Sequence, residues 1–227
     1  ELIYSVNFNY IYFYMVNKIF LIGFNKTATC SFYKFFSKNN IKSCHFYSHR
    51  YYDKNDLIPR KNQKPYCCRD KWYRTLVNHF RMNEKKHKKL LDGIENDVIF
   101  FSDITDDCTS TDAKDFYKKL HIQNPGSKFI LNIRNVDKWI LSRKKHWRSG
   151  LLEKHCKYFN CNKTEIDNIW KNIFFDHVND VIKYFKNENT KLLIYDIEKD
   201  QPKKIVDFFK NDFKLDEKHW GVHNKAH

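Results

Sequence analysis

The chain has 227 residues, enough for one domain with a sizeable hydrophobic core. It carries 42 lysines and arginines against 27 aspartates and glutamates, and the formal net charge of +15 favours anionic partners. No run of about 18 apolar residues occurs, so the composition argues against a membrane-spanning helix. The charge has two possible sources, a site for polyanions or a nucleotide-biased genome that over-uses lysine, and the sequence leaves both open.

The cysteines and the N-terminal segment bear on compartment and domain limits. The chain has seven cysteines, an odd number, and residues 1–17 show no signal peptide. We therefore expect free thiols in a reducing, cytoplasmic compartment. Their spacing matches no zinc site, so no metal is predicted. Cys156 and Cys161 are close enough in sequence for a disulfide, which stays open. We expect residues 1–17 to be an extension, native or not, in front of a single domain at 18–227.

The first distinctive stretch is 18–36, which reads KIFLIGFNKTATCSFYKFF. Ile19 to Ile22 predict a buried strand, and a polar loop follows before aromatic residues recur at helical spacing from Cys30. The free N–H groups and the dipole of a first helical turn favour an anion. We therefore expect a phosphate- or sulfate-binding loop formed by Asn25, Lys26, Thr27, Ala28, Thr29, Cys30 and Ser31. The alternative is that Lys26 is a solvated loop residue and Thr27 a helix cap.

The next segments are less specific. Ile41 to Tyr47 predict a second strand, in which His45 is either a candidate base or a hydrogen-bonded structural residue. The segment 50–70 is long and polar, which is typical of either an acceptor-covering loop or a surface insert. A basic helix is predicted over residues 71–92.

Carboxylates follow the third predicted strand, Asp97 to Phe101. Because a carboxylate at a strand end suits proton abstraction, Asp103 is a candidate general base. In the alternative interpretation the carboxylates at 103, 106 and 107 cap a helix that begins near Thr111, which we favour for Asp106 and Asp107.

A second anion-binding pattern follows the strand Phe129 to Ile133. Arg134 lies at the carboxyl end of this strand, and Ser142 lies two turns into the next predicted helix. The two can converge on one phosphate, which Arg134 would bind through its planar guanidinium. Apolar residues at helical spacing then predict a core helix over 165–186, before a last strand at Leu192 to Tyr195. Alternating strands and helices predict an α/β fold of three layers, with a parallel sheet of about five strands covered on both faces.

The loop GFNKTATCS and the segment RNVDKWILS resemble the two nucleotide signatures of the sulfotransferases that use 3′-phosphoadenosine 5′-phosphosulfate (PAPS). The first is similar to their 5′-phosphosulfate loop, G-x-x-K-[ST]-G-[ST]-[ST], and the second to their 3′-phosphate motif, R-[DN]-P-x-x-x-x-x-S. The segments 97–103 and 220–227 resemble two further parts of these sulfotransferases, the third strand and the terminal H-x-N segment, and agree with them in order and spacing. The chain departs from the pattern at Ala28, where the family has Gly, at Cys30, where it has Ser or Thr, and at Val136, where it has Pro. Ala28 is strained if its φ is positive.

The resemblance implies a P-loop-like fold and transfer of a sulfuryl group from PAPS to a hydroxyl or amine, without a metal. Lys26 would stabilise the leaving nucleotide, the loop would hold the 5′-phosphosulfate, and Arg134 with Ser142 would bind the 3′-phosphate. The sequence does not identify the acceptor, which would be a carbohydrate or a small molecule, and the basic surface favours an anionic one. A P-loop kinase is the second hypothesis, although the sequence lacks its Gly-Lys-Ser/Thr signature. A basic nucleic-acid-binding domain is the third.

Overall fold

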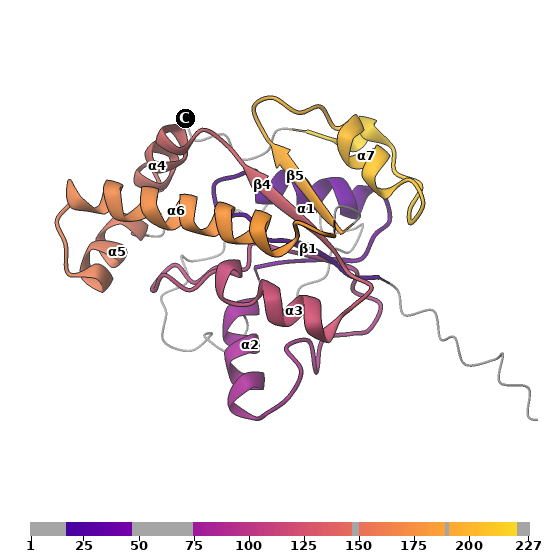
Figure 1. Cartoon of the computed structure of the whole chain (residues 1–227), viewed down its shortest axis with the longest axis horizontal. Helices are drawn as coiled ribbons and strands as arrows, with labels where there is room; N and C mark the ends of the chain where they lie inside the picture. The colour runs from indigo at the N-terminus through magenta and orange to yellow at the C-terminus, as the bar shows by residue number, and fades with distance from the viewer. Residues whose placement is uncertain (1–16, 47–74, 147–149, 189–190, 222–227) are drawn as a thin grey trace, which may run out of the picture.

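The computed structural model describes residues 17–46, 75–146, 150–188 and 191–221. These residues form a five-stranded sheet in the order β2-β3-β1-β4-β5, in which all neighbouring strands are parallel. The strands are β1 (Ile19–Leu21), β2 (Ser43–His45), β3 (Phe100–Ser102), β4 (Lys128–Ile133) and β5 (Leu192–Asp196). The predicted parallel sheet of about five strands is confirmed (Figure 1).

Helices connect the strands and cover both faces of the sheet. They are α1 (Thr29–Lys38), α2 (Leu76–Lys85), α3 (Tyr117–Gln123), α4 (Val136–Lys144), α5 (Leu151–Phe159), α6 (Glu165–Tyr184) and α7 (Lys203–Phe209), with short 3-10 turns η3 (Ala113–Asp115) and η5 (Glu217–His219). None of the helices in these described ranges is long and apolar enough to cross a membrane.

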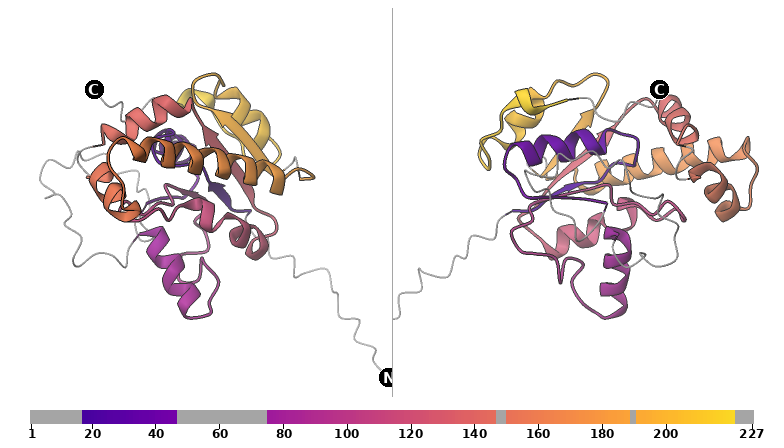
Figure 2. Two further views of the ribbon diagram at one scale, coloured as in Figure 1. Left: turned by 60° about the vertical axis from the view of Figure 1, so that its left-hand side comes forward. Right: turned by 180° about the vertical axis from the view of Figure 1, so that it is seen from behind.

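The core has one layer of apolar side chains on each side of the sheet. On one side α1 and α7 pack through Phe32, Phe36 and Phe209 against the strands. On the other side α2, α3 and the C-terminal part of α6 pack against Phe20 and Phe129, among others. In Figure 1 α6 lies in front of the sheet, and α1 comes to the front in the right-hand view of Figure 2. The domain therefore has the predicted three layers.

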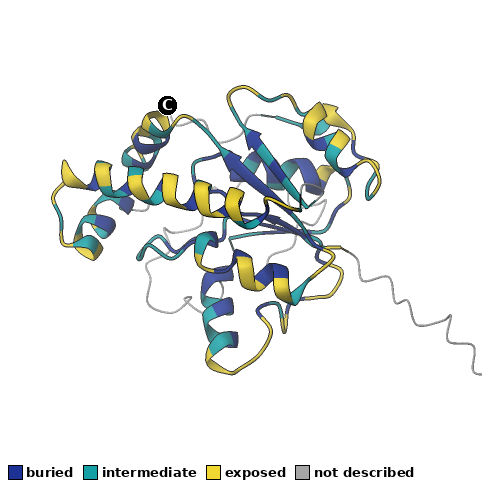
Figure 3. Cartoon of the chain, in the orientation of Figure 1, coloured by how far each residue is buried: buried dark blue, intermediate teal, exposed yellow. Residues whose placement is uncertain are grey.

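A third apolar cluster joins α4, α5 and the N-terminal part of α6. It contains Trp139, Trp170 and Phe174, and Phe24 from the loop after β1 packs into it. The predicted core stripe of the long helix is confirmed at five buried positions, Ile166, Trp170, Phe174, His177 and Val181. It is wrong at Ile182, which is exposed. Figure 3 shows the result, with buried strands and an exposed outer face on α6.

Several local boundaries differ from the sequence prediction, among them the third strand, which begins at Phe100 and not at Asp97. The second strand ends at His45, because Phe46 adopts a left-handed conformation with φ 64°. The basic helix is shorter than predicted: Thr75 caps α2, and the helix ends at Lys85. The predicted capping by Asp106 and Asp107 is wrong, since Asp112 forms the capping box of η3.

Several predictions fall outside the described residues. They concern the extension at 1–16, the loop at 50–70, and residues 222–227 of the terminal segment. Cys156 and Cys161 have free thiols that form a hydrogen bond with each other.

Candidate active site

A cavity of about 560 Å³ opens at the carboxyl ends of the strands. This is the edge at which parallel α/β sheets bind their ligands. Of the residues predicted from the sequence, the cavity is lined by Asn25, Lys26, Ala28, Thr29, Cys30, Ser31, Asp103, Arg134 and Ser142. The cavity is also lined by Asp107, Lys138, Leu141, Lys145, His146, Ile197 and Glu198. Thr27 and His45 belong to the predicted set but do not line this cavity.

The loop after β1 is fixed by a buried asparagine of β4. Asn132 Oδ1 accepts from Gly23 N at 2.9 Å, and Asn132 Nδ2 donates to Thr27 O at 2.7 Å and to Thr27 Oγ1 at 2.5 Å. Gly23 has to be glycine, since a Cβ there would lie 2.1 Å from Asn132 O. The Thr27 hydroxyl also donates to Phe24 O, so this side chain is used inside the loop.

The same loop contains two residues with left-handed backbone. Lys26 has φ 66° and Ala28 has φ 65°. A non-glycine residue in this region costs about 1–2 kcal/mol, so Ala28 is strained where the resembling family has glycine. Ala28 directly precedes α1 and provides no side-chain cap. The first turn of α1 therefore presents the positive end of its dipole to the cavity, although Ser31 N–H already donates to Ala28 O at 2.9 Å.

Arg134 brings the two predicted anion-binding segments into contact. Its Nη1 donates to Lys26 O at 3.1 Å, and its Nη2 lies 3.5 Å from Glu198. Its Nε is buried and has no hydrogen-bond partner among the described residues. Ser142, two turns along α4, lines the same cavity. Burial lowers the pKa of Lys26, although the charge of Asp103 opposes this effect. The spatial convergence predicted from the two motifs is present.

Asp103 lies directly after β3, with a left-handed φ of 57°. Thr29 Oγ1 donates to its Oδ1 at 3.3 Å, and His45 Nε2 lies 3.7 Å from its Oδ2. Burial raises the pKa of Asp103 to about 6, against the opposing effects of Thr29 and Lys26. His45 itself is held by Ser102 Oγ at 2.9 Å from Nδ1 and by Cys30 Sγ at 3.3 Å from Nε2. His45 thus contacts Asp103 without lining the cavity.

In a comparison with models of protein families, the family model described as the sulfotransferase domain matches residues 18–212 of the chain. The chain belongs to the sulfotransferase family. It is therefore a member of a family of transferases. Among solved structures it is similar to a sulfotransferase from Alicyclobacillus acidocaldarius, with 14% identity, 88% of this chain and 84% of that chain covered, and a TM-score of 0.47. A search among curated proteins gave no match.

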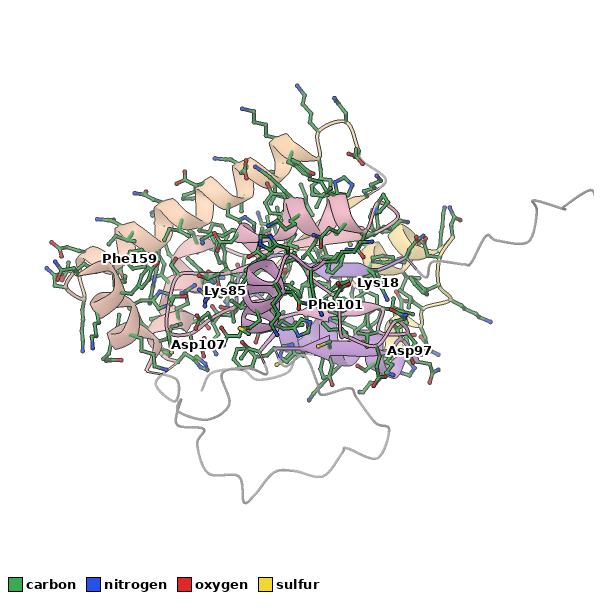
Figure 4. All side chains as sticks on the ribbon, turned by 90° about the horizontal axis from the view of Figure 1, so that it is seen from below. Lys18, Lys85, Asp97, Phe101, Asp107 and Phe159 are labelled. Atoms are coloured by element: carbon green, nitrogen blue, oxygen red, sulfur yellow. The ribbon has the colours of Figure 1, made fainter. Side chains whose placement is uncertain are left out.

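The cavity of this sulfotransferase domain has a second carboxylate, Asp107, which the sequence analysis assigned to helix capping. Burial and the neighbouring charge of Asp103 raise its pKa to about 6. In Figure 4 Asp107 lies to the left of Lys18 and Asp97, which precede β1 and β3. Asp103 and Asp107 both follow β3, at the carboxyl edge of the sheet.

The basic residues at and just after the C-terminal end of α4, Arg143 to His146, divide between the core and the cavity. The Arg143 guanidinium is buried between Trp139 and Trp170, at 4.7 and 4.5 Å from their ring centres. Lys144 pairs with Asp167 at 2.6 Å. Lys145 and His146 line the cavity. Within the described ranges no three His, Cys, Asp or Glu side chains are grouped so that they could hold a metal ion.

Proposed function

We propose that this sulfotransferase domain moves a sulfuryl group from PAPS to a hydroxyl or amine of a carbohydrate or small-molecule acceptor. One observation carries the proposal: the Lys26 loop and the Arg134–Ser142 pair, distant in sequence, line one cavity. Its volume, about 560 Å³, is in the usual range for ligand pockets. A nucleotide with phosphate groups on both sides of its ribose can bridge the two segments.

The residues of the two segments fit such a nucleotide. Lys26 and the first turn of α1 supply positive charge for the 5′-phosphosulfate. The buried Nε of Arg134 lacks a hydrogen-bond partner in the described part of the chain, and an oxygen of the 3′-phosphate would satisfy it. The Ser142 hydroxyl also lines the cavity as a further donor.

The donor supplies an activated sulfuryl group. In the reaction the bond from sulfur to the bridging oxygen breaks, a bond from sulfur to the acceptor oxygen or nitrogen forms, and the acceptor proton passes to a base. Lys26 stabilises the negative charge that develops on the bridging oxygen, as a preorganised electrostatic group. Asp103 is the proposed base, because its carboxylate lines the cavity and its pKa of about 6 leaves it deprotonated at neutral pH. His45 contacts Asp103 but not the cavity, so we assign it to positioning Asp103.

Isothermal titration calorimetry with adenosine 3′,5′-bisphosphate tests the nucleotide assignment. Wild type should bind this ligand more tightly than Mg-ATP, and Arg134→Ala should lose most of that affinity. Arg134→Lys keeps the charge without the planar guanidinium and should bind at an intermediate level. Lys42→Ala removes a lysine that pairs with Asp97 outside the cavity and should behave as wild type. Equal affinity of wild type and Arg134→Ala would refute the assignment, and preference for Mg-ATP would favour a kinase.

A further inference from the structure

Glu198 follows β5 and occupies the end of the cavity that contains Arg134. Its carboxylate lies 3.5 Å from Arg134 Nη2 and 3.2 Å from Lys138 Nζ. The backbone N–H of Asn135, the N-cap residue of α4, donates to the second carboxylate oxygen at 3.3 Å. One carboxylate thus contacts a guanidinium, an ammonium and the N-terminus of a helix.

These three groups are the ones that typically bind a phosphate. Glu198 is only one quarter exposed, and its backbone N–H donates to Asp196 Oδ1 at 3.0 Å, which orders the turn after β5. Burial alone would raise the pKa of Glu198, but the bonds from Lys138 and Asn135 and the charge of Arg134 hold this pKa below its usual value. The carboxylate is therefore a bound anion within the protein.

Glu198 is also a poor substitute for a phosphate. At 3.5 Å its contact with Arg134 is long, and Arg134 Nε stays without a partner in the described part of the chain. A phosphate monoester carries more charge than a carboxylate and has three acceptor oxygens. A phosphate would thus displace Glu198, whereas a ribose hydroxyl would not.

We propose that Glu198 competes with the 3′-phosphate of the nucleotide for Arg134 and Lys138, and so lowers the affinity of the protein for the bisphosphate product. The proposal rests on the proposed function, because it takes Arg134 to be a ligand of the 3′-phosphate. Part of the binding energy of that phosphate is used to displace the carboxylate. A nucleotide without a 3′-phosphate leaves Glu198 in place.

Calorimetric titration of wild type and Glu198→Gln with adenosine 3′,5′-bisphosphate and with adenosine 5′-monophosphate tests the proposal. Because a partly exposed ion pair contributes little, Glu198→Gln should bind the bisphosphate about threefold to fivefold more tightly. Its affinity for the monophosphate should not increase. Glu198→Ala serves as a second variant and should show the same difference between the two ligands.

The matched control is Glu95→Gln, which removes the same charge from a surface ion pair with Lys42, near the amino ends of β2 and β3. This variant should bind both ligands as wild type does. Bisphosphate binding by Glu198→Gln that equals or falls below that of wild type overturns the competition, because it makes Glu198 neutral or a residue that orients Arg134. Failure of the proposed function has a different signature, namely that wild type itself does not prefer the bisphosphate to the monophosphate.

Discussion

Replacing Asp103 by asparagine should stabilise the fold at high pH and remove the proposed base. Burial raises the pKa of this carboxyl from 3.8 to about 6. The stability that the neutral acid provides is complete below the unfolded value of 3.8 and is lost as the pH rises through about 6. Asparagine is neutral at every pH and tolerates the left-handed backbone at this position. The stability difference between the two proteins should therefore grow from pH 3.8, where the unfolded carboxyl ionises, and reach its full size above about pH 6.

The size of this effect follows from the pKa difference. A difference of about 2 corresponds to roughly 3 kcal/mol when the pH is well above both pKa values. The Asp103 side chain is 18% exposed, and Thr29 and Lys26 stabilise its charged form. Since solvent and the loss of these contacts reduce the gain, we expect Asp103→Asn to raise the free energy of unfolding by about 1–2 kcal/mol at pH 8.

Urea denaturation at pH 5 and pH 8 measures this difference, and a turnover assay accompanies it. The gain from Asp103→Asn should be about half as large at pH 5, because the carboxyl of the unfolded chain is already ionised there while the folded one is still protonated. Its kcat should fall by about 10²- to 10⁴-fold, the usual contribution of a general base. Asp97→Asn is the control, because a hydrogen bond from Lys42 lowers the pKa of that exposed carboxyl and no gain at pH 8 is expected. An equal stability change at both pH values would show that the buried charge is not its cause. Unchanged kcat would remove Asp103 as the base.

Three further substitutions test the loop after β1. Asn132→Ala should lower the free energy of unfolding by about 3 kcal/mol in urea titrations, because Gly23 N–H and Thr27 O lose their buried partner. A loss below about 1 kcal/mol would contradict the role of Asn132 in fixing the loop. Ala28→Gly should keep or raise the thermal midpoint, since relief of about 1–2 kcal/mol of strain offsets the entropy of the unfolded glycine, and a clear drop would argue against the left-handed backbone. Lys26→Ala should lower kcat by about 10²-fold or more, while calorimetry shows a dissociation constant for adenosine 3′,5′-bisphosphate that changes less than tenfold. A larger loss of affinity than of turnover would instead make Lys26 a binding residue.

The arrangement of the site could be predicted because it depends on parallel strands. Lys26, Asp103 and Arg134 each come just after a predicted strand, and the carboxyl ends of parallel strands meet at one edge of the sheet. That reasoning requires only the strand positions and their direction. It does not require the strand order, which the sequence left open and the structure gives as β2-β3-β1-β4-β5.

The residues that sequence reasoning missed act through contacts between distant segments. Asn132 joins β4 to the loop after β1, and Glu198 joins the turn after β5 to Arg134. Asn132 left one signal, a polar side chain inside an apolar strand, which has to find buried partners. Glu198 left none, because a glutamate in a charged turn is usually solvated. The Trp139–Arg143–Trp170 stack was missed for a similar reason, since a basic run on a helix predicts an exposed face.

The charges that line the cavity bear on two separate questions, namely what attracts the nucleotide and whether the acceptor is anionic. The net charge of +15 suggested an anionic acceptor, and that expectation stays a prediction. Lys26, Arg134 and Lys138 contribute positive charge to the cavity, whereas the carboxylates of Asp103 and Asp107 lie after β3. An anionic group beside two carboxylates would be repelled, and a hydroxyl or amine that donates a hydrogen bond to them would be attracted. Under the proposed function, Lys26, Arg134 and Lys138 would attract the nucleotide, and the identity of the acceptor would depend on the few side chains around Asp103.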